Sequence, residues 1–166
     1  MDVRLCSAAD LKSLTVAWPA PGGVHEAHTA RAEDGSHDYL VAGCQGEPLG
    51  SSVIRWTGYE GGEGSAAHPD AVEVCHLQVR PEYRGQCVGT ALIKASERRV
   101  LRRGRRSIAV GVADDNPGAR KLYERLGFRP TGIIDVSEYE WVDADGATHH
   151  ARECDQMLLK ELRDQP

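Results

Sequence analysis

The sequence LQVRPEYRGQCVGT occupies residues 77–90, where a strand pattern passes through a glycine-containing turn into a helical pattern. A helix N-terminus presents unpaired N–H groups and about half a positive charge, so such a turn can bind an anion. Arg84 adds a permanent cation beside it. Turns between strands and helices also use glycine simply to change direction. These residues alone therefore leave phosphate binding and a structural turn both open.

The segments on either side of this turn have clear periodicities. Upstream, Ala71–Val79 is a β-branched run that ends where Pro81 disfavours a continued central strand. Downstream, apolar residues follow the i, i+3, i+4, i+7 spacing of a helix from Val88 to Ala95, and Gly104 offers a C-terminal stop. We therefore predict a strand, a turn and a helix in that order.

The rest of the chain supplies further strands and helices. A helix from Ser7, a suitable N-cap, to about Ala17 is expected. The expected strands are 3–5, 39–42, 50–56, 108–112, 132–142 and 149–159, the last two joined by a hairpin turn at 143–146. The glycine-rich run 58–64 is expected to be a loop, and segment 18–38 has too weak a periodicity for an assignment. The order predicts an α/β fold with one mixed sheet.

Length and composition exclude several classes of protein. The chain has 166 residues, 18.1 kDa and a net charge of -5, which favours one domain over 1–166 and argues against nucleic acid as a partner. No stretch approaches the roughly 18 apolar residues of a membrane span, so we expect a cytoplasmic protein without membrane contact. Five scattered cysteines indicate neither a disulfide framework nor a zinc site.

One short motif suggests a metal but lacks the right spacing. His25-Glu26-Ala27-His28 is one residue short of the H-E-x-x-H pattern that places two imidazoles on one helical face around zinc. We therefore favour a solvated loop here over a metal site, and we expect no metal in this protein.

A second motif lies about thirty residues beyond the first. Residues 116–128 read NPGARKLYERLGF, in which Asn116-Pro117 is a good helix start and Gly127 a good stop. The two motifs, in this order and at this spacing, resemble those of the GNAT superfamily of acyl-CoA N-acetyltransferases. The resemblance implies a mostly antiparallel sheet, flanked by helices and splayed between its fourth and fifth strands.

The resemblance also implies acetyl-CoA as co-substrate and a set of residues that bind it. The pantetheine arm would pair with the backbone of Leu77 and Val79, and the pyrophosphate would lie on the turn. The implied coenzyme-binding residues are Leu77, Gln78, Val79, Arg84, Gly85, Gln86, Cys87, Val88, Gly89, Thr90, Asn116, Ala119 and Tyr123. The family has glycine where this chain has Cys87, whose Cβ disfavours positive φ, so weaker coenzyme binding or a shifted turn is expected.

Two catalytic roles follow from the resemblance. A primary amine is mostly protonated at neutral pH and attacks a thioester only after losing a proton. Glu73 matches the position of the acid that several family members use as base, with a solvated strand carboxylate and a His76 base as alternatives. Tyr123 would protonate the departing sulfur, although its helical position also suits packing. No residue looks like an acyl-enzyme nucleophile, so we predict direct transfer in a ternary complex.

Two classes of function remain open at this stage. The first is an N-acetyltransferase acting on the primary amine of a small molecule or peptide. The second is a non-catalytic GNAT-fold module that binds acyl-CoA or acts as a sensor, an alternative that Cys87 keeps open. The identity of the acceptor is not encoded in a readable motif. Dimers are common among similar proteins, so a homodimer stays open alongside a monomer.

Overall fold

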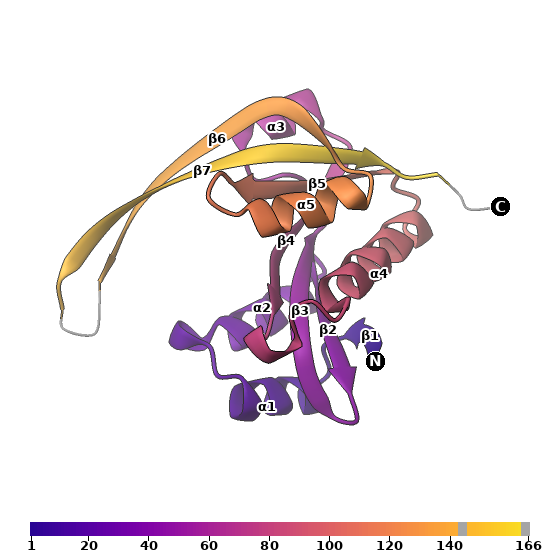
Figure 1. The fold of residues 1–166 in the computed structure, drawn as a ribbon, viewed down its shortest axis with the longest axis vertical. Helices are drawn as coiled ribbons and strands as arrows, with labels where there is room; N and C mark the ends of the chain where they lie inside the picture. The colour runs from indigo at the N-terminus through magenta and orange to yellow at the C-terminus, as the bar shows by residue number, and fades with distance from the viewer. Residues whose placement is uncertain (143–145, 164–166) are drawn as a thin grey trace.

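The computed structural model describes residues 1–142 and 146–163 as one seven-stranded sheet with helices on both faces (Figure 1). The strands are β1 (Asp2–Leu5), β2 (His37–Cys44), β3 (Glu47–Arg55), β4 (Ala71–Val79), β5 (Ser107–Ala113), β6 (Arg129–Val142) and β7 (Thr148–Glu161). The helices are α1 (Ala8–Ala17), α2 (Val24–Glu33), α3 (Gly62–Ala67), α4 (Val88–Arg102) and α5 (Pro117–Arg125), with 3₁₀ turns at Pro21–Gly23 and Pro81–Tyr83. Within these ranges no helix is both long and apolar enough to cross a bilayer.

The strand order β1-β2-β3-β4-β5-β7-β6 confirms the predicted fold class. The β4–β5 pair is parallel, and the other five neighbouring pairs are antiparallel. A parallel pair needs a crossover connection, and α4 provides it. The expected 143–146 turn falls largely on 143–145, outside the described residues.

Two helices were not expected from the sequence. Helix α2 lies inside the unassigned segment 18–38, and its buried residues are His25 and His28 rather than an apolar stripe. Helix α3 begins at Gly62, inside the run expected to be a loop. A Cβ at Gly64 would lie within 2.7 Å of both Tyr59 and Met157, so glycine lets this short helix pack closely. A polar buried face and a packing glycine are both invisible to apolar periodicity.

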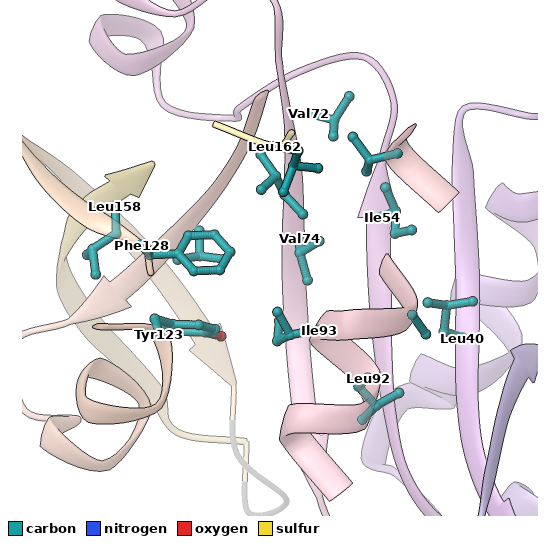
Figure 2. Close-up of a cluster of buried hydrophobic side chains, with 14 of the residues drawn as sticks. Leu40, Ile54, Val72, Val74, Leu92, Ile93, Tyr123, Phe128, Leu158 and Leu162 are labelled. Carbon is teal, nitrogen blue, oxygen red and sulfur yellow. The ribbon is translucent and has the colours of Figure 1, made fainter. Parts of the chain in front are cut away.

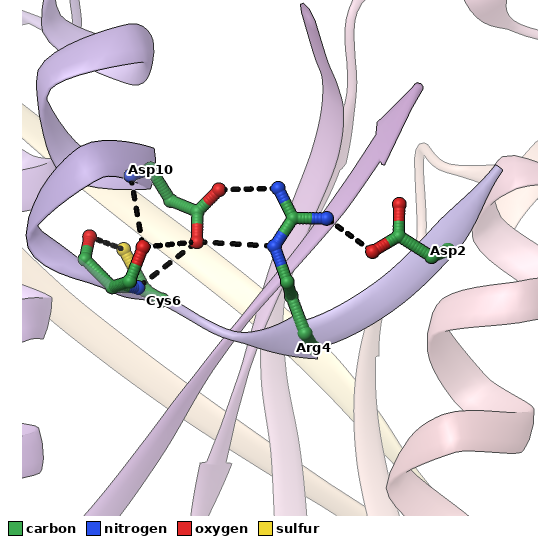
Figure 3. A network of polar contacts seen from close by, with 5 residues as sticks. Asp2, Arg4, Cys6 and Asp10 are labelled. Atoms are coloured by element: carbon green, nitrogen blue, oxygen red, sulfur yellow. Dashed lines mark hydrogen bonds and ion pairs between the residues drawn. The ribbon is translucent and has the colours of Figure 1, made fainter. Parts of the chain in front are cut away.

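Helix α1 begins at the predicted N-cap. The Ser7 hydroxyl oxygen accepts from the Asp10 N–H at 3.2 Å, and the Asp10 carboxylate accepts from the Ser7 N–H at 3.0 Å, which forms a capping box. Arg4 of β1 also donates to Asp10 and pairs with Asp2 (Figure 3). Burial opposes ionisation of Asp10, but the bonds from Arg4 and Ser7 outweigh it and lower its pKa. This network fixes α1 against the edge of the sheet.

The main core lies between one face of the sheet and the helices α4 and α5, which pack on that face. Apolar side chains of β2, β3 and β4 meet the buried face of α4, and Tyr123 and Phe128 extend this core toward β7. Figure 2 shows this cluster, including Leu40, Ile54, Val74, Leu92, Ile93, Tyr123, Phe128 and Leu158. Full burial of a side chain such as Leu92 contributes about 1.5–3 kcal/mol. Helices α1 and α2 pack on the opposite face, against β2 and β3.

The sheet parts between its two central strands. Pairing of β4 with β5 covers only Ala71 to Glu73 on β4 and ends at the Glu73–Ala109 pair. Beyond that point β5 stays paired with β7 as far as Ala113, while β4 stays paired with β3 as far as Val79. The implied splay between the fourth and fifth strands is therefore present, and one edge of β4 is left open.

Candidate active site

A cleft of about 820 Å³ lies where β4 leaves β5, and we call it the coenzyme cleft. It is walled by β4, by the turn before α4 and by the start of α5. The predicted residues in its lining are Leu77, Gln78, Val79, Arg84, Gly85, Cys87, Val88, Gly89, Thr90, Asn116 and Ala119. Two motifs that are distant in the sequence thus form one site.

Two of the predicted coenzyme-binding residues lie outside this lining. The Gln86 amide turns back and donates to the Glu82 carbonyl at 3.0 Å. Tyr123 is 5% exposed and packs its ring at 5.6 Å from that of Phe128, while burial raises the pKa of its hydroxyl. Figure 2 shows this hydroxyl directed away from α5 toward β4. Tyr123 therefore serves the core and also points its polar end at the parted strands.

The turn before α4 has a left-handed backbone at two positions. Gly85 has φ of 74° and Cys87, the N-cap residue of α4, has φ of 63°. A residue with a Cβ is disfavoured there by roughly 1–2 kcal/mol relative to glycine. The Cys87 thiol is exposed and lines the cleft. The backbone thus keeps a conformation typical of glycine although a cysteine occupies the position.

Helices α4 and α5 approach each other closely across the cleft. A Cβ at Gly89 would lie 3.1 Å from a methyl carbon of Leu122, so glycine permits this contact. The Asn116 side chain caps α5 by accepting from the Ala119 N–H at 3.0 Å. This cap accounts for the capping role predicted for Asn116, and the side chain also faces the cleft.

A β-bulge re-aims β4 immediately beside the cleft. Between Ser51 and Val53 of β3, the partner residue on β4 moves from Gln78 to Cys75, so β4 carries one extra residue. His76 occupies the bulge with φ of 50°, and its ring packs against that of His28. Cys75 faces the α1 side of the sheet and Leu77 faces the main core. The bulge therefore turns the open edge of β4 toward the coenzyme cleft.

Glu73 is buried where β4 and β5 part. Its side chain is 8% exposed, accepts from Arg55 Nη1 at 2.8 Å and accepts from the Glu60 N–H at 3.1 Å. Burial raises the pKa of Glu73, while Arg55 and the Glu60 amide oppose the rise. The alternative of a solvated strand carboxylate is therefore wrong. A carboxylate with a raised pKa is a stronger base than a solvated one.

The histidines of α2 are buried, so the expected solvated loop is also wrong. His25 bridges the Tyr39 hydroxyl at 2.7 Å and the Trp18 carbonyl at 2.8 Å. His28 packs its ring 4.6 Å from that of His76, and its Nε2 has no hydrogen-bond partner among the described residues. Burial, with His76 and Arg31 nearby, lowers the pKa of His28 to about 4. Among the described residues no three His, Cys, Asp or Glu side chains group around a metal position.

Several residues at the site were not anticipated from the sequence. Arg55 ends β3 and pairs with Glu73, Trp18 follows α1 into the cleft lining, and Arg125 lines the cleft from α5. The Arg125 guanidinium donates to the Thr90 hydroxyl at 3.4 Å, which links both motifs. A charged residue ending an apolar strand was the available signal for Arg55. Nothing in the sequence distinguished Arg125 from the other arginines.

The cleft offers what a diphosphate with a long extended arm requires. The open edge of β4 leaves main-chain groups beyond Glu73 without partners on β5, so an extended ligand can pair there as an added strand. The first amides of α4 are unpaired within the helix and lie beside Arg84, which favours an anion. The open strand edge and the helix N-terminus therefore fit the chemistry of coenzyme A.

Comparison with known proteins gives one family and many similar structures. The family model described as acetyltransferase (GNAT) family matches residues 8–128. The N-acetyltransferase from Staphylococcus aureus Mu50 has a TM-score of 0.71 at 14% identity, covering 98% of this chain and 98% of that chain. The ribosomal-protein-S18-alanine N-acetyltransferase from Escherichia coli has a TM-score of 0.65 at 17% identity, covering 99% of this chain and 96% of that one.

A third structure was determined with a bound ligand. The phosphinothricin acetyltransferase from Sinorhizobium meliloti, in complex with AcCoA, has a TM-score of 0.67 at 20% identity, covering 97% of this chain and 88% of that chain. At these identities the likenesses concern the fold. They extend over nearly the whole of this chain, whereas the family model ends at Phe128.

Proposed function

Because this chain belongs to the acetyltransferase (GNAT) family, we propose that it transfers the acetyl group of acetyl-CoA to a primary amine of a small molecule or peptide. The observation that carries the proposal is the coenzyme cleft, where the open edge of β4 and the first turn of α4 face one space. The names of similar structures cite acceptors as different as a ribosomal-protein alanine and phosphinothricin. We therefore keep both acceptor classes.

Coenzyme binding is assigned mainly to the main chain. Arg84 to Thr90 supply amides for the phosphates, with Arg84 and Arg125 as cations beside them. Leu77 and Val79 supply the strand edge for the arm, and Asn116 orders the start of α5. Bound acetyl-CoA would supply a thioester, whose carbonyl carbon the amine nitrogen attacks. The main-chain N–H groups at the β4 bulge are the proposed donors to that carbonyl oxygen.

Glu73 is the proposed base that takes a proton from the acceptor amine, directly or through water. Its burial and raised pKa suit a base, and its bonds to Arg55 and the Glu60 amide hold the carboxylate in place. His76 remains the alternative base because it sits on the bulge itself. At physiological pH the imidazole of His76 is neutral, since burial and nearby Arg55 lower its pKa.

Tyr123 is the proposed donor of a proton to the departing sulfur. Its hydroxyl points from α5 toward β4 and keeps its proton at neutral pH, because burial raises its pKa. A thiolate is a fair leaving group, with an ordinary pKa of about 8.5, so partial proton donation suffices. Together with Glu73 this gives direct transfer from the coenzyme to the amine, without an acyl-enzyme.

The second candidate is a non-catalytic module that binds acyl-CoA. Cys87 favours it, because this residue strains the turn that should bind the phosphates. The two are separated by measuring thiol release from acetyl-CoA with a broad panel of primary amines, alongside thermal-shift titration with CoA. We expect CoA to raise the melting temperature and at least one amine to release thiol. Binding without turnover across the panel would favour the module, and no binding would remove both candidates.

A further inference from the structure

A second pocket, of about 380 Å³, opens on the side of the sheet that carries α2. We call it the acid pocket, and its lining includes Arg31, His37, Arg55, Thr57, Tyr59 and Glu60. Its lining residue Arg55 bonds directly to the Glu73 carboxylate. The Arg55 guanidinium therefore connects the pocket to the carboxylate of Glu73, the proposed base, which lies where β4 and β5 part.

The acid pocket is a cationic spot on an acidic chain. Arg31 is exposed on α2, and among the described residues no carboxylate pairs with its guanidinium. His37 lies beside it, and the pKa of His37 is lowered by burial and then by the charges of Arg55 and Arg31. Arg31 acts in the same direction on His28 and His76. Glu60 and Asp34 act in the opposite direction on His37, so the excess of positive charge in the lining rests on two guanidinium groups, Arg31 and Arg55, against the Glu60 carboxylate.

Arg55 pairs with two carboxylates that differ in their exposure to solvent. Its Nη1 lies 2.8 Å from an oxygen of Glu73 and 2.8 Å from an oxygen of Glu60. The Glu73 side chain is 8% exposed, whereas that of Glu60 is 77% exposed. An exposed ion pair contributes little to stability, so Glu60 can be exchanged for another acid without disturbing the buried Arg55–Glu73 pair. Glu60 thus occupies the position that a ligand's acid group would take.

Building on the proposed function, we propose that the acid pocket binds an acid group of the acceptor, a carboxylate or phosphonate, and thereby places its amine at Glu73. The acceptor is then zwitterionic, an amino acid or a close analogue. Arg31 and Arg55 receive the acid group and Glu60 swings away. Arg31 and His37 are specificity residues in this arrangement, since neither touches the reacting atoms.

The test compares free amino acids and aminoalkyl phosphonates with the carboxamides of the same amino acids, by thiol release from acetyl-CoA. Wild-type protein is expected to prefer the acids. In Arg31→Gln the KM for an acid-bearing acceptor should rise about tenfold, the usual scale of one charge-assisted hydrogen bond, while the KM for its carboxamide stays unchanged. Arg98→Gln removes one cation from an exposed position of α4. It is the matched control and should change neither KM.

A second variant should act in the opposite direction. Glu60→Gln removes the exchangeable carboxylate from Arg55 but keeps the backbone N–H that Glu73 accepts, so the KM for acid-bearing acceptors should fall several-fold. Glu63→Gln, on the neighbouring helix α3 and outside the pocket lining, is its control. A rise in KM with Glu60→Gln, or equal KM values for acids and carboxamides in the wild type, would overturn the inference.

Failure of this inference is distinguishable from failure of the proposed function. Amines that release thiol without preference for acids leave the transferase in place and remove the acid pocket. If no amine is acetylated, NMR titration of the His37 imidazole with the same amino acids still tests the pocket. Bound acid should raise the His37 pKa in the wild type and not in Arg31→Gln. No change in either protein would count against the pocket.

Discussion

The two faces of the parted sheet are built from different groups. On the α4 face, the coenzyme cleft consists of a strand edge and a turn, so the contacts that we propose for the coenzyme come mainly from main-chain amides. On the α2 face, the site consists of side chains that bind one another, including the Arg55–Glu73 pair and the His28–His76 ring contact. The backbone conformation determines which groups the α4 face presents, and the identity of the side chains determines which groups the α2 face presents.

This difference predicts how each face responds to substitution. Main-chain contacts tolerate most side chains, except where the backbone requires a left-handed residue, as at Cys87. Side-chain contacts between buried charged groups fail when either partner is removed, because the remaining charge or polar atom is left unpaired. The α2 face should therefore show large effects from single substitutions, and the coenzyme cleft small ones.

The largest effect is expected from Glu73→Gln. Loss of a general base typically lowers kcat by about 10²-fold or more, and glutamine keeps the shape of the side chain. Coenzyme affinity should stay within twofold because Glu73 is absent from the cleft lining. Steady-state kinetics and a CoA titration measure the two quantities, with the melting temperature as a check on folding. A kcat within twofold of the wild type would move the base to His76 or to water.

The next effect concerns stability and comes from His28→Phe. In the folded protein the pKa of His28 is about 4, against 6.5 ordinarily, so protons bind to the unfolded chain first as the pH falls. This pKa difference leaves the free energy of unfolding unchanged above pH 6.5 and lowers it by about 3 kcal/mol as the pH falls from 6.5 to 4. The variant lacks this loss. Urea unfolding at several pH values should show the wild type losing about that much free energy of unfolding relative to the variant between pH 6.5 and 4, and parallel curves would contradict the prediction.

A smaller effect on rate is expected from Tyr123→Phe. A thiolate with an ordinary pKa of about 8.5 leaves with little help, so kcat should fall only about tenfold. The ring contact with Phe128 is retained, so the melting temperature should change little. Measured kcat at saturating acetyl-CoA tests the acid role. An unchanged kcat would leave Tyr123 as a packing residue alone.

The smallest effect is expected from Cys87→Gly in the coenzyme cleft. Glycine adopts this left-handed backbone at about 1 kcal/mol lower cost, which should stabilise the fold, and loss of the Cβ also frees space where the turn should approach the phosphates, so CoA should bind several-fold more tightly. Cys87→Ser keeps the Cβ and is the matched control, with an affinity like that of the wild type. Isothermal titration with CoA gives both values. Equal affinities in all three proteins would show that the turn accommodates cysteine without cost to the ligand.

The comparison also explains which parts of the structure were predictable. Local rules of periodicity, capping and glycine use predict the Ala71–Val79 strand, the turn from this strand into α4, and the ends of α4 and α5. These same elements form the coenzyme cleft. Helix α2 follows no such rule, because its buried face is made of histidines that bond to Tyr39 and Trp18 from elsewhere in the chain. Its burial is satisfied only by tertiary partners.

The amino-acid order by itself determined the β4 strand, the left-handed turn and the start of α4, because each depends on a few adjacent residues, whereas the open edge of β4 depends on where its pairing with β5 ends. The tertiary structure alone decided that Arg55 pairs with Glu73, that Arg125 reaches Thr90, and that Arg31 lines a pocket together with Arg55. These residues are distant in the chain, and the free energy of an ion pair depends on burial and separation. Neither quantity exists until the chain has folded.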